Sequence, residues 1–457
     1  MEKTFERTRT CRERPGRKRR ASKKKAAAAI KLYRAGQVKE VWPLLKLTED
    51  PAARSYLIRD LGSSGAIAAP LFRQLTIETD ISIRRAIILC LGGFDSSAVS
   101  AADQRSFTTY LLKLYRTDAD PGIHSAIDWL LRYGCQGLNP RRLNWGQSVT
   151  LATIDSELAG PRKNNSKWFC TKQGQTMAVI DGPVNYMMGT PGFEPGRDKT
   201  NTEALHQEQV PRSFAIATKE VTVTQFQRFL DANPAIKELA KMGGNKDPSR
   251  EGEWMQRLGL DDNAPQVFIT WFEAAQYCNW LNAQEGIPED QWCYPSIEEI
   301  KEGVTLPASY LHRTGYRMPT EAEWEYACRA GTTSTRSFGD AEELLPGYAW
   351  FSGNTFNQRP YPVGQLKPND FGLFDMYGNV WEWGQDLIKS YRMDARDSAW
   401  VDKEDESRTV SKDFKRSRRG GSYTYSADFL RSGYRNDGYI PDERRDSVGF
   451  RVAKTVP

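Results

Sequence analysis

Long apolar runs are missing from this 457-residue chain. No stretch approaches the roughly 18 consecutive apolar residues of a transmembrane helix, and the longest, residues 86–94, has the length of a buried helix segment. The basic N-terminus is not followed by an apolar core, which excludes a secretory signal. We therefore expect no transmembrane segment and a cytoplasmic protein, or else a fragment of a longer membrane-associated one.

Cysteine and histidine are scarce and dispersed. The seven cysteines show neither a CxxC pair nor metal-finger spacing, and the three histidines, His124, His206 and His312, lie far apart. The pattern excludes zinc-finger modules. It favours reduced, mostly buried thiols in an intracellular compartment.

Net charge is low outside one tail. Residues 1–27 hold 12 Lys or Arg against 3 Asp or Glu, which leaves 52 against 55 for the rest of the chain. A basic block of this kind predicts a solvated, disordered tail. Nucleic acid and acidic lipid remain open as partners of this tail.

Residues 28–140 contain three similar stretches that begin at Asp50, Asp80 and Asp120, each with a leucine eleven residues later. Aspartate caps the free N–H groups at a helix start, and apolar residues then recur at helical spacing. The spacing of the stretches is typical of paired-helix solenoids. The segment resembles HEAT-like repeats, which either bind a protein partner or brace the next domain.

Three residues of this segment carry further expectations. Gly62 and Gly92 follow the first two stretches and suit left-handed caps at helix ends. His124 takes the place of an arginine in the third stretch, and we expect it on a helix surface rather than as a ligand. Residues 141–171 are assigned as a linker.

Residues 172–457 are rich in Trp, Tyr, Gly and Pro and carry several short motifs in a fixed order. The motifs are RMPTEAEWEYA from Arg317, GLFDMYGNVWEW from Gly372, RGGS from Arg419 and GFR from Gly449. This succession resembles the sulfatase-modifying factor family, which includes formylglycine-generating enzymes. The resemblance implies a compact domain related to C-type lectins and poor in regular secondary structure. With the helical repeats, the expected fold class is α+β.

One motif can be interpreted without the family. Thr320 and Glu323 have the T-x-x-E spacing of a capping box, directly after a proline. The helix that they start carries Trp324, Ala327 and Cys328 on one face. We expect this face in the core.

A second motif predicts a calcium site. Asp375 and Glu382 flank a turn at Gly378, and two carboxylates near inward-facing carbonyls suit a hard cation. Members of the family hold a structural calcium with this motif. The resemblance assigns the side chains of Asp375 and Glu382 and the carbonyls of Gly378 and Val380 as ligands, with Glu220 as a further contributor.

The ligands of the family's redox metals are missing. Formylglycine-generating enzymes hold copper with two thiolates after the RGGS segment, and those positions are Tyr425 and Leu430 here. No cysteine follows Cys328. The HxxxHxE pattern of the iron-dependent branch is also absent. We expect neither copper nor iron.

The family's substrate groove lies beside the RGGS segment. Its candidate residues here are Trp381, Ser422, Tyr425, Arg431 and Tyr434, which form a recognition pocket or simply pack. The leading interpretation is a bacterial pseudoenzyme that binds a protein or peptide through this groove or through the repeats. The alternative is an oxidative modifying enzyme of the family with a non-standard active site.

Overall fold

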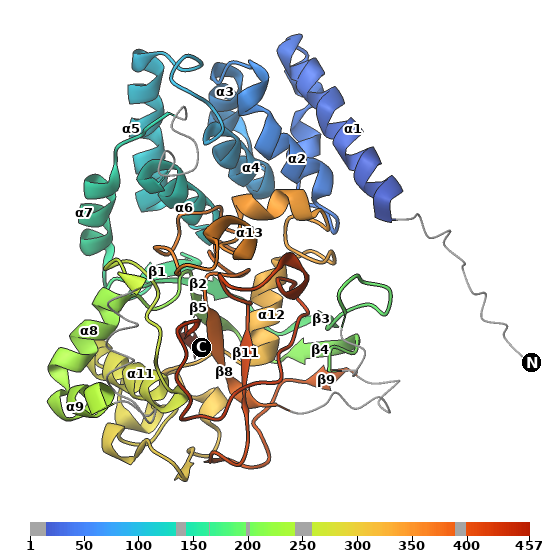
Figure 1. Ribbon diagram of the computed structural model, residues 1–457. Coiled ribbons are helices and arrows are strands. Elements are labelled where there is room, and N and C mark those ends of the chain that lie inside the picture. The colour runs from blue at the N-terminus through green and yellow to red at the C-terminus, as the bar shows by residue number, and fades with distance from the viewer. Residues whose placement is uncertain (1–14, 134–142, 164, 198–201, 243–257, 389–398) are drawn as a thin grey trace, which may run out of the picture.

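The computed structural model describes residues 15–133, 143–163, 165–197, 202–242, 258–388 and 399–457. Helices of the N-terminal part stand above a domain of short strands and helices (Figure 1). The N-terminal helices are α1 Pro15–Arg34, α2 Ala52–Asp60, α3 Ala69–Ile77, α4 Ile81–Leu91, α5 Ala101–Thr117, α6 Pro121–Asp128 and α7 Ser148–Leu158. None of the described helices is both long and apolar enough to span a membrane.

Two of the three aspartates predicted to cap helices, Asp80 and Asp120, do so. The cap position of α2 is instead Pro51, and Asp50 accepts one hydrogen bond from the Ala52 N–H at 3.2 Å. Asp80 accepts hydrogen bonds from the backbone N–H groups of Ser82 and Ile83 at the start of α4. Asp120 accepts one from Ile123 in α6. The helices pack as consecutive pairs, α1 on α2, α3 on α4 and α5 on α6, and α4 contacts both α2 and α6.

The expected role of the two glycines is wrong. Neither Gly62 nor Gly92 has the positive φ of a left-handed cap, and Gly92 has a φ of −70°. A Cβ atom at Gly62 would lie 2.2 Å from the backbone of Gly93, and one at Gly92 would lie 2.3 Å from the ring of Trp129. These glycines allow close packing between turns rather than a change of backbone direction.

The basic tail and the linker are also more ordered than predicted. Residues 15–27 belong to α1, which buries Ala26 and Ala29 and pairs Lys18 with Asp50 at 2.9 Å. Residues 1–14 lie outside the described residues. The predicted linker contains α7 and the strand β1, Trp168–Cys170, which pairs with β2, Thr176–Ile180. The sheet therefore begins before residue 172, the predicted start of the domain. The sequence analysis missed β1 because a strand of three residues is too short to show an alternating pattern.

The C-terminal part is built from short strands. One sheet has the order β1-β2-β5-β13-β7, and smaller sheets have the orders β11-β8-β12, β3-β4-β9 and β10-β6. The remaining strands are β3 Val184–Met188, β4 His206–Val210, β5 Phe214–Ala217, β6 Val304–Thr305, β7 Tyr316–Arg317, β8 Trp381–Leu387, β9 Trp400–Val401, β10 Thr409–Val410, β11 Arg416–Arg419, β12 Val448–Gly449 and β13 Ala453–Thr455. The helices are α8 Val223–Ala232, α9 Pro234–Met242, α11 Trp271–Glu285, α12 Glu321–Arg329 and α13 Ser352–Thr355.

The capping box at Thr320 is confirmed. Its side chain accepts from the backbone of Glu323, whose carboxylate accepts from the Thr320 N–H at 3.0 Å. Trp324, Ala327 and Cys328 of the same helix are buried, as predicted. The cysteines among the described residues are free and buried.

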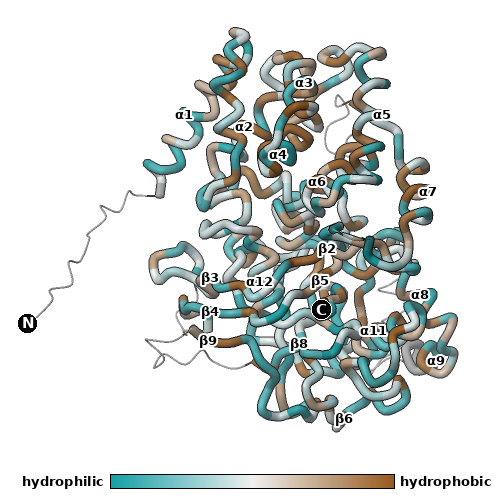
Figure 2. The backbone as a smooth tube through the Cα atoms, turned by 180° about the vertical axis from the view of Figure 1, so that it is seen from behind, coloured by the Kyte–Doolittle hydropathy of each residue, from teal (hydrophilic) through white to brown (hydrophobic). Residues whose placement is uncertain are grey.

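The two parts share one hydrophobic core, which runs from α1 to β13. At its edge the buried guanidinium of Arg54 binds both carboxylate oxygens of Asp370, at 2.7 and 2.9 Å. Figure 2 shows the contrast in hydropathy within the helical part, where α4 is largely apolar and the first turns of α1 are hydrophilic. The segment before the predicted calcium motif is thus fixed by the helices above it.

Candidate functional site

The RGGS segment leaves β11 through two glycines. Gly420 and Gly421 have φ values of +102° and +81°, which side chains with a Cβ rarely adopt. The preceding strand β11 pairs with β8, so that Arg419 lies opposite Glu382. This turn directs residues 422–431 back across the domain.

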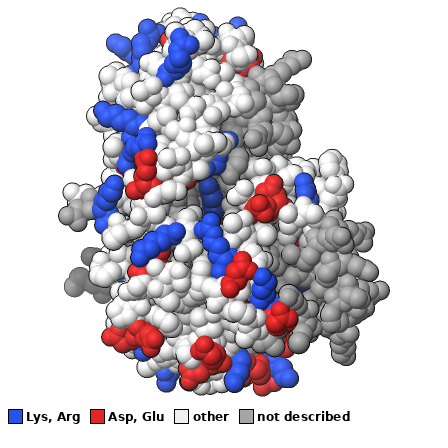
Figure 3. All heavy atoms as spheres, turned by 90° about the vertical axis from the view of Figure 1, so that its left-hand side faces the viewer, with Lys and Arg blue, Asp and Glu red and all other residues white. Residues whose placement is uncertain are grey.

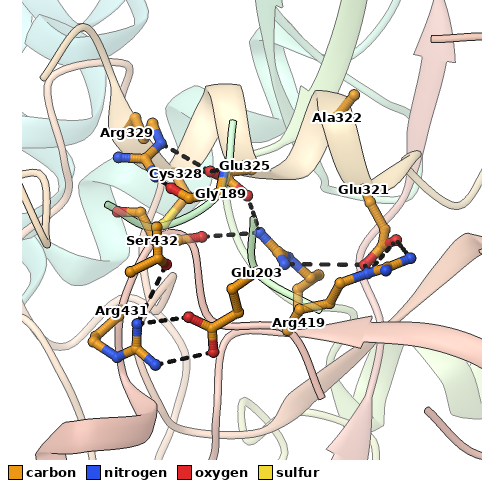
Figure 4. A network of polar contacts seen from close by, with 12 residues as sticks. Gly189, Glu203, Glu321, Ala322, Glu325, Cys328, Arg329, Arg419, Arg431 and Ser432 are labelled. Carbon is orange, nitrogen blue, oxygen red and sulfur yellow. Dashed lines mark hydrogen bonds and ion pairs between the residues drawn. The ribbon is translucent and has the colours of Figure 1, made fainter. Parts of the chain in front are cut away.

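Buried ion pairs hold the segment on both sides (Figure 4). Arg419 of β11 binds Glu325 of α12 and donates to the Ser432 carbonyl at 2.9 Å. Arg329 reaches the same Glu325 at 2.7 Å. Arg431 binds Glu203 with both Nη atoms, at 2.9 and 3.0 Å. These contacts position the segment and leave none of these guanidinium groups facing solvent.

Three aromatic residues that follow the glycines form a cluster with Trp381 of β8. We call the four rings the aromatic cluster: Trp381, Tyr425, Phe429 and Tyr434. Neighbouring ring centroids lie 5.2 to 5.9 Å apart, mostly edge to face. Trp381 is fully buried, whereas Tyr425 and Tyr434 are half-buried and Phe429 is 36% exposed. The Nε1 atom of Trp381 has no hydrogen-bond partner among the described residues.

The structure divides the predicted groove residues into two groups. Tyr425 and Tyr434 reach the surface beside Phe429, which the sequence analysis did not single out. Trp381, Ser422 and Arg431 are buried and do not present their side chains to a ligand. For Arg431 the reason is Glu203, which is distant in sequence and neutralises it. The only sequence feature that could have indicated Phe429 is its position next to Leu430, one of the two positions where the family has thiolates.

The two positions of the missing thiolates are filled by packing side chains. Leu430 is fully buried, and a Cβ atom at Gly378 or Gly421 would lie 3.1 or 2.9 Å from its methyl groups. Tyr425 packs edge to face on Trp381 at 5.2 Å. Neither side chain offers a sulfur ligand.

The predicted calcium motif carries an excess of buried carboxylates. Asp375 has a φ of +58°, accepts from the Gly364 N–H at 2.7 Å through Oδ2, and leaves Oδ1 without a partner among the described residues. Glu382 is held by Arg451 at 2.5 and 2.6 Å and by Trp324 at 2.8 Å. A carboxylate has about four lone-pair sites, so these contacts do not exhaust Glu382.

Glu220 adds a third carboxylate to this cluster. It accepts from the side chain of Asn379 at 2.7 Å and from the Val380 N–H at 3.3 Å. Burial raises the pKa of Glu220 well above its ordinary value, and the charges of Asp375 and Glu382 raise it further. Burial likewise raises the pKa of Asp375 to about 6. Three carboxylates against the single guanidinium of Arg451, with one oxygen unpaired, form a donor set that fits a hard cation.

Comparisons with known proteins agree with the family that the motifs indicate. The family described as sulfatase-modifying factor enzyme 1-like domain matches residues 164–456. The formylglycine-generating enzyme of Mycobacterium tuberculosis is 31% identical over 234 residues, which span 45% of this chain and 72% of that enzyme. The serine/threonine-protein kinase pkn1 of Chlamydia pneumoniae is 27% identical over 252 residues, 53% of this chain and 33% of the kinase. Among solved structures, PvdO from Pseudomonas aeruginosa is similar with a TM-score of 0.46 and 26% identity, over 63% of this chain and 98% of PvdO.

Proposed function

This chain belongs to the sulfatase-modifying factor family, and from that premise we propose that its C-terminal domain binds a peptide or protein ligand and does not carry out copper-dependent oxidation. The observation that carries the proposal is the filled position of the missing thiolates. Leu430 is fully buried against Gly378 and Gly421. An isobutyl group there supplies no ligand for a metal.

The argument against copper is one of coordination chemistry. Monovalent copper selects soft thiolate ligands. The segment after RGGS contains no cysteine, and Tyr425 offers only a phenol oxygen, on a ring that packs against Trp381. The chain's relatives named formylglycine-generating enzymes therefore share its fold, while the sequence here lacks the sulfur pair on which we expect their chemistry to depend.

The aromatic cluster supports the binding role. Aromatic side chains that are rigid and partly exposed contribute strongly to protein recognition, because they bury a large area at a small entropic cost. Tyr425, Phe429 and Tyr434 present such a surface on a base fixed by Trp381. The cluster is too tightly packed to be an open cage, so the ligand lies across it with apolar side chains rather than inserting a cation.

Calcium is the cofactor that we propose for this domain. Asp375 and Glu382 supply side-chain oxygens, and Gly378 and Val380 supply carbonyls. The unpaired Oδ1 of Asp375 and the nearby Glu220 support this ligand set. A bound calcium ion would offset the excess of negative charge and hold the turn that carries Trp381.

One experiment separates binding from catalysis. The full chain is loaded with monovalent copper and incubated in air with a sulfatase peptide that contains the cysteine substrate, and the peptide is analysed by mass spectrometry. We expect no aldehyde product. Conversion of the cysteine by the wild-type protein at a rate that depends on copper would contradict the proposal.

A second experiment tests the surface itself. The full chain is used to select from a displayed library of random peptides, and the enriched peptides are measured against Tyr425→Ala and Phe429→Ala. We expect each variant to weaken binding by about 10-fold or more, the scale of an aromatic hot spot. Phe414→Ala is the matched control, because Phe414 is 52% exposed and lies outside the aromatic cluster. An equal effect of Phe414→Ala would show that the enriched peptides bind elsewhere.

A further inference from the structure

Three side chains that can bind metals meet where the helical part joins the domain. They are His124 of α6, Asp155 of α7 and Cys170 of β1. A ring nitrogen, a carboxylate oxygen and the Sγ atom of these residues all lie within 4.8 Å of one another. His124 is 2% exposed, so its predicted place on a helix surface is wrong.

The histidine is held in a single orientation. Its Nδ1 lies 3.0 Å from the backbone carbonyl of Tyr115. Its ring is stacked between those of Tyr115 and Trp168, with centroids 4.0 and 3.7 Å away. Because a carbonyl only accepts, Nδ1 carries the proton and Nε2 keeps its lone pair. Histidine binds metals as the neutral imidazole.

The other two ligands are similarly prepared. Asp155 accepts hydrogen bonds from the Tyr115 hydroxyl at 2.6 Å and from Arg132 at 2.7 Å, which orient it and leave further lone pairs. Cys170 is a free, buried thiol whose Sγ lies 3.6 Å from the Thr176 hydroxyl. Partners that orient ligands in this way are a regular feature of metal sites.

We propose that His124, Asp155 and Cys170 bind one zinc ion, with the fourth position open. Nitrogen, oxygen and sulfur together suit zinc, whereas calcium and magnesium take oxygen ligands. A cavity of about 320 Å³ is lined by Tyr115, Asp155 and Thr176 among others, so it reaches the Asp155 ligand, and it has room for a bound water. Its lining residues come from both the helical part and the domain. Lys and Arg side chains lie along the middle of the face that Figure 3 shows.

The zinc ion would connect two parts of the molecule. His124 and Asp155 belong to α6 and α7, and Cys170 belongs to the first strand of the domain's largest sheet. A metal that bridges elements of both parts binds only the folded state and stabilises their junction.

A catalytic cysteine is the competing interpretation of the same residues. A nucleophile needs an accessible thiolate, but Cys170 is 2% exposed and burial raises its pKa to about 12. The Nδ1 atom of His124 is bound to a carbonyl rather than to a carboxylate that would support a general base. A metal ion, in contrast, displaces the thiol proton on binding.

Cobalt is the probe that tests the proposal, because a cobalt–thiolate bond absorbs in the near ultraviolet and can be titrated. The metal-free full chain should bind about one cobalt ion with this absorption, and zinc should displace it. In Cys170→Ser the thiolate band should disappear. In Asp155→Asn the affinity should fall at least about 10-fold, the lower end of the loss caused even by outer-shell changes.

Cys90→Ser is the matched control, since Cys90 is also a free, fully buried thiol but belongs to α4. It should keep the thiolate band unchanged. The absence of the band in the wild-type protein would overturn the proposal, as would its persistence in Cys170→Ser. Excess calcium should not displace the cobalt, which separates this site from the one at Asp375.

Discussion

Two groups of buried charges meet at β8 and β11, where Glu382 lies opposite Arg419, and they are balanced differently. In the first group the four arginines face four carboxylates: Arg329, Arg419, Arg431 and Arg435 with Glu194, Glu203, Glu321 and Glu325. In the second, Glu220, Asp375 and Glu382 share Arg451.

The difference in charge balance distinguishes a group that only supports the structure from a group that can bind an ion. A buried charge is tolerated where it is paired and hydrogen-bonded. In the first group every arginine has a carboxylate partner, and these pairs fix the RGGS segment. The carboxylate excess around Asp375 has unpaired capacity and raised pKa values, which are the signs of a place that takes up a proton or a cation. Breaking each group in turn tests this distinction.

The largest effect is expected from Glu325→Gln. The carboxylate of Glu325 holds Arg329, Arg419 and the Gly189 N–H. Removing its charge takes the carboxylate partner from the buried Arg329 and leaves Arg419 with the more distant Glu321 at 3.9 Å. The loss of a buried counter-ion costs about 3–5 kcal/mol. Urea unfolding measures the loss. The exposed Glu289→Gln should change stability by no more than about 0.5 kcal/mol, and a similar small effect for Glu325→Gln would refute the structural role of the balanced group.

A third group of buried charges contains Asp402, Glu323 and Arg212, and a substitution of Asp402 tests whether Arg212 neutralises this carboxylate fully. The Asp402 carboxylate accepts from Thr320 at 2.8 Å and binds Arg212, which also pairs with Glu323. Burial raises the pKa of Asp402 to about 6, although Arg212 acts in the opposite direction. Since the folded pKa lies above the unfolded one, this group stabilises the protein fully below about pH 4, and the contribution is lost as the pH rises through 6.

The size of this pH effect follows from the shift. Two pKa units correspond to about 3 kcal/mol. Unfolding free energies of the wild-type protein and Asp402→Asn, measured from pH 4 to 7, should diverge by up to that amount, with the variant gaining relative stability at high pH. Parallel curves would show that Arg212 neutralises Asp402 fully.

We expect calcium to stabilise the protein through the second group, in which Glu220, Asp375 and Glu382 share Arg451. Calcium at about 100 times its dissociation constant should stabilise the wild-type protein by about 2.7 kcal/mol relative to the chelated protein. Asp375→Asn should lose this response, because its Oδ1 is the unpaired oxygen of the site. Asp413→Asn, at an exposed position, is the control. A full calcium response in Asp375→Asn would place the ion elsewhere.

Local signals were predictable from the sequence. The caps at Asp80, Asp120 and Thr320 depend on residues within three positions, and the structure confirms each. The family was also recognisable, because its motifs are contiguous. The prediction for Gly62 was wrong because the role of this glycine depends on Gly93, which is distant in sequence and is brought next to it only by helix packing.

The candidate sites required the fold for the same reason. Arginine is a residue type that often recognises ligands, but the charge of Arg431 is neutralised by Glu203, which lies 228 positions away in the sequence. His124, Asp155 and Cys170 come from three separate elements, and no spacing rule connects them. Helix α1 is held by acidic partners such as Asp50 that composition alone could not assign. Long-range pairing is therefore what the sequence could not supply.

The smallest effect is expected from Glu220→Gln, the same chemical change as Glu325→Gln in the other group. Glutamine keeps the shape of Glu220 and one acceptor for Asn379 or Val380, and it removes one negative charge from a cluster that has too many. The lost hydrogen bond and the relieved repulsion oppose each other, each by about 1 kcal/mol. Calcium-free unfolding in urea should therefore change by less than about 1 kcal/mol. A loss as large as that of Glu325→Gln would mean that both groups are equally balanced, and the distinction between support and site would no longer hold.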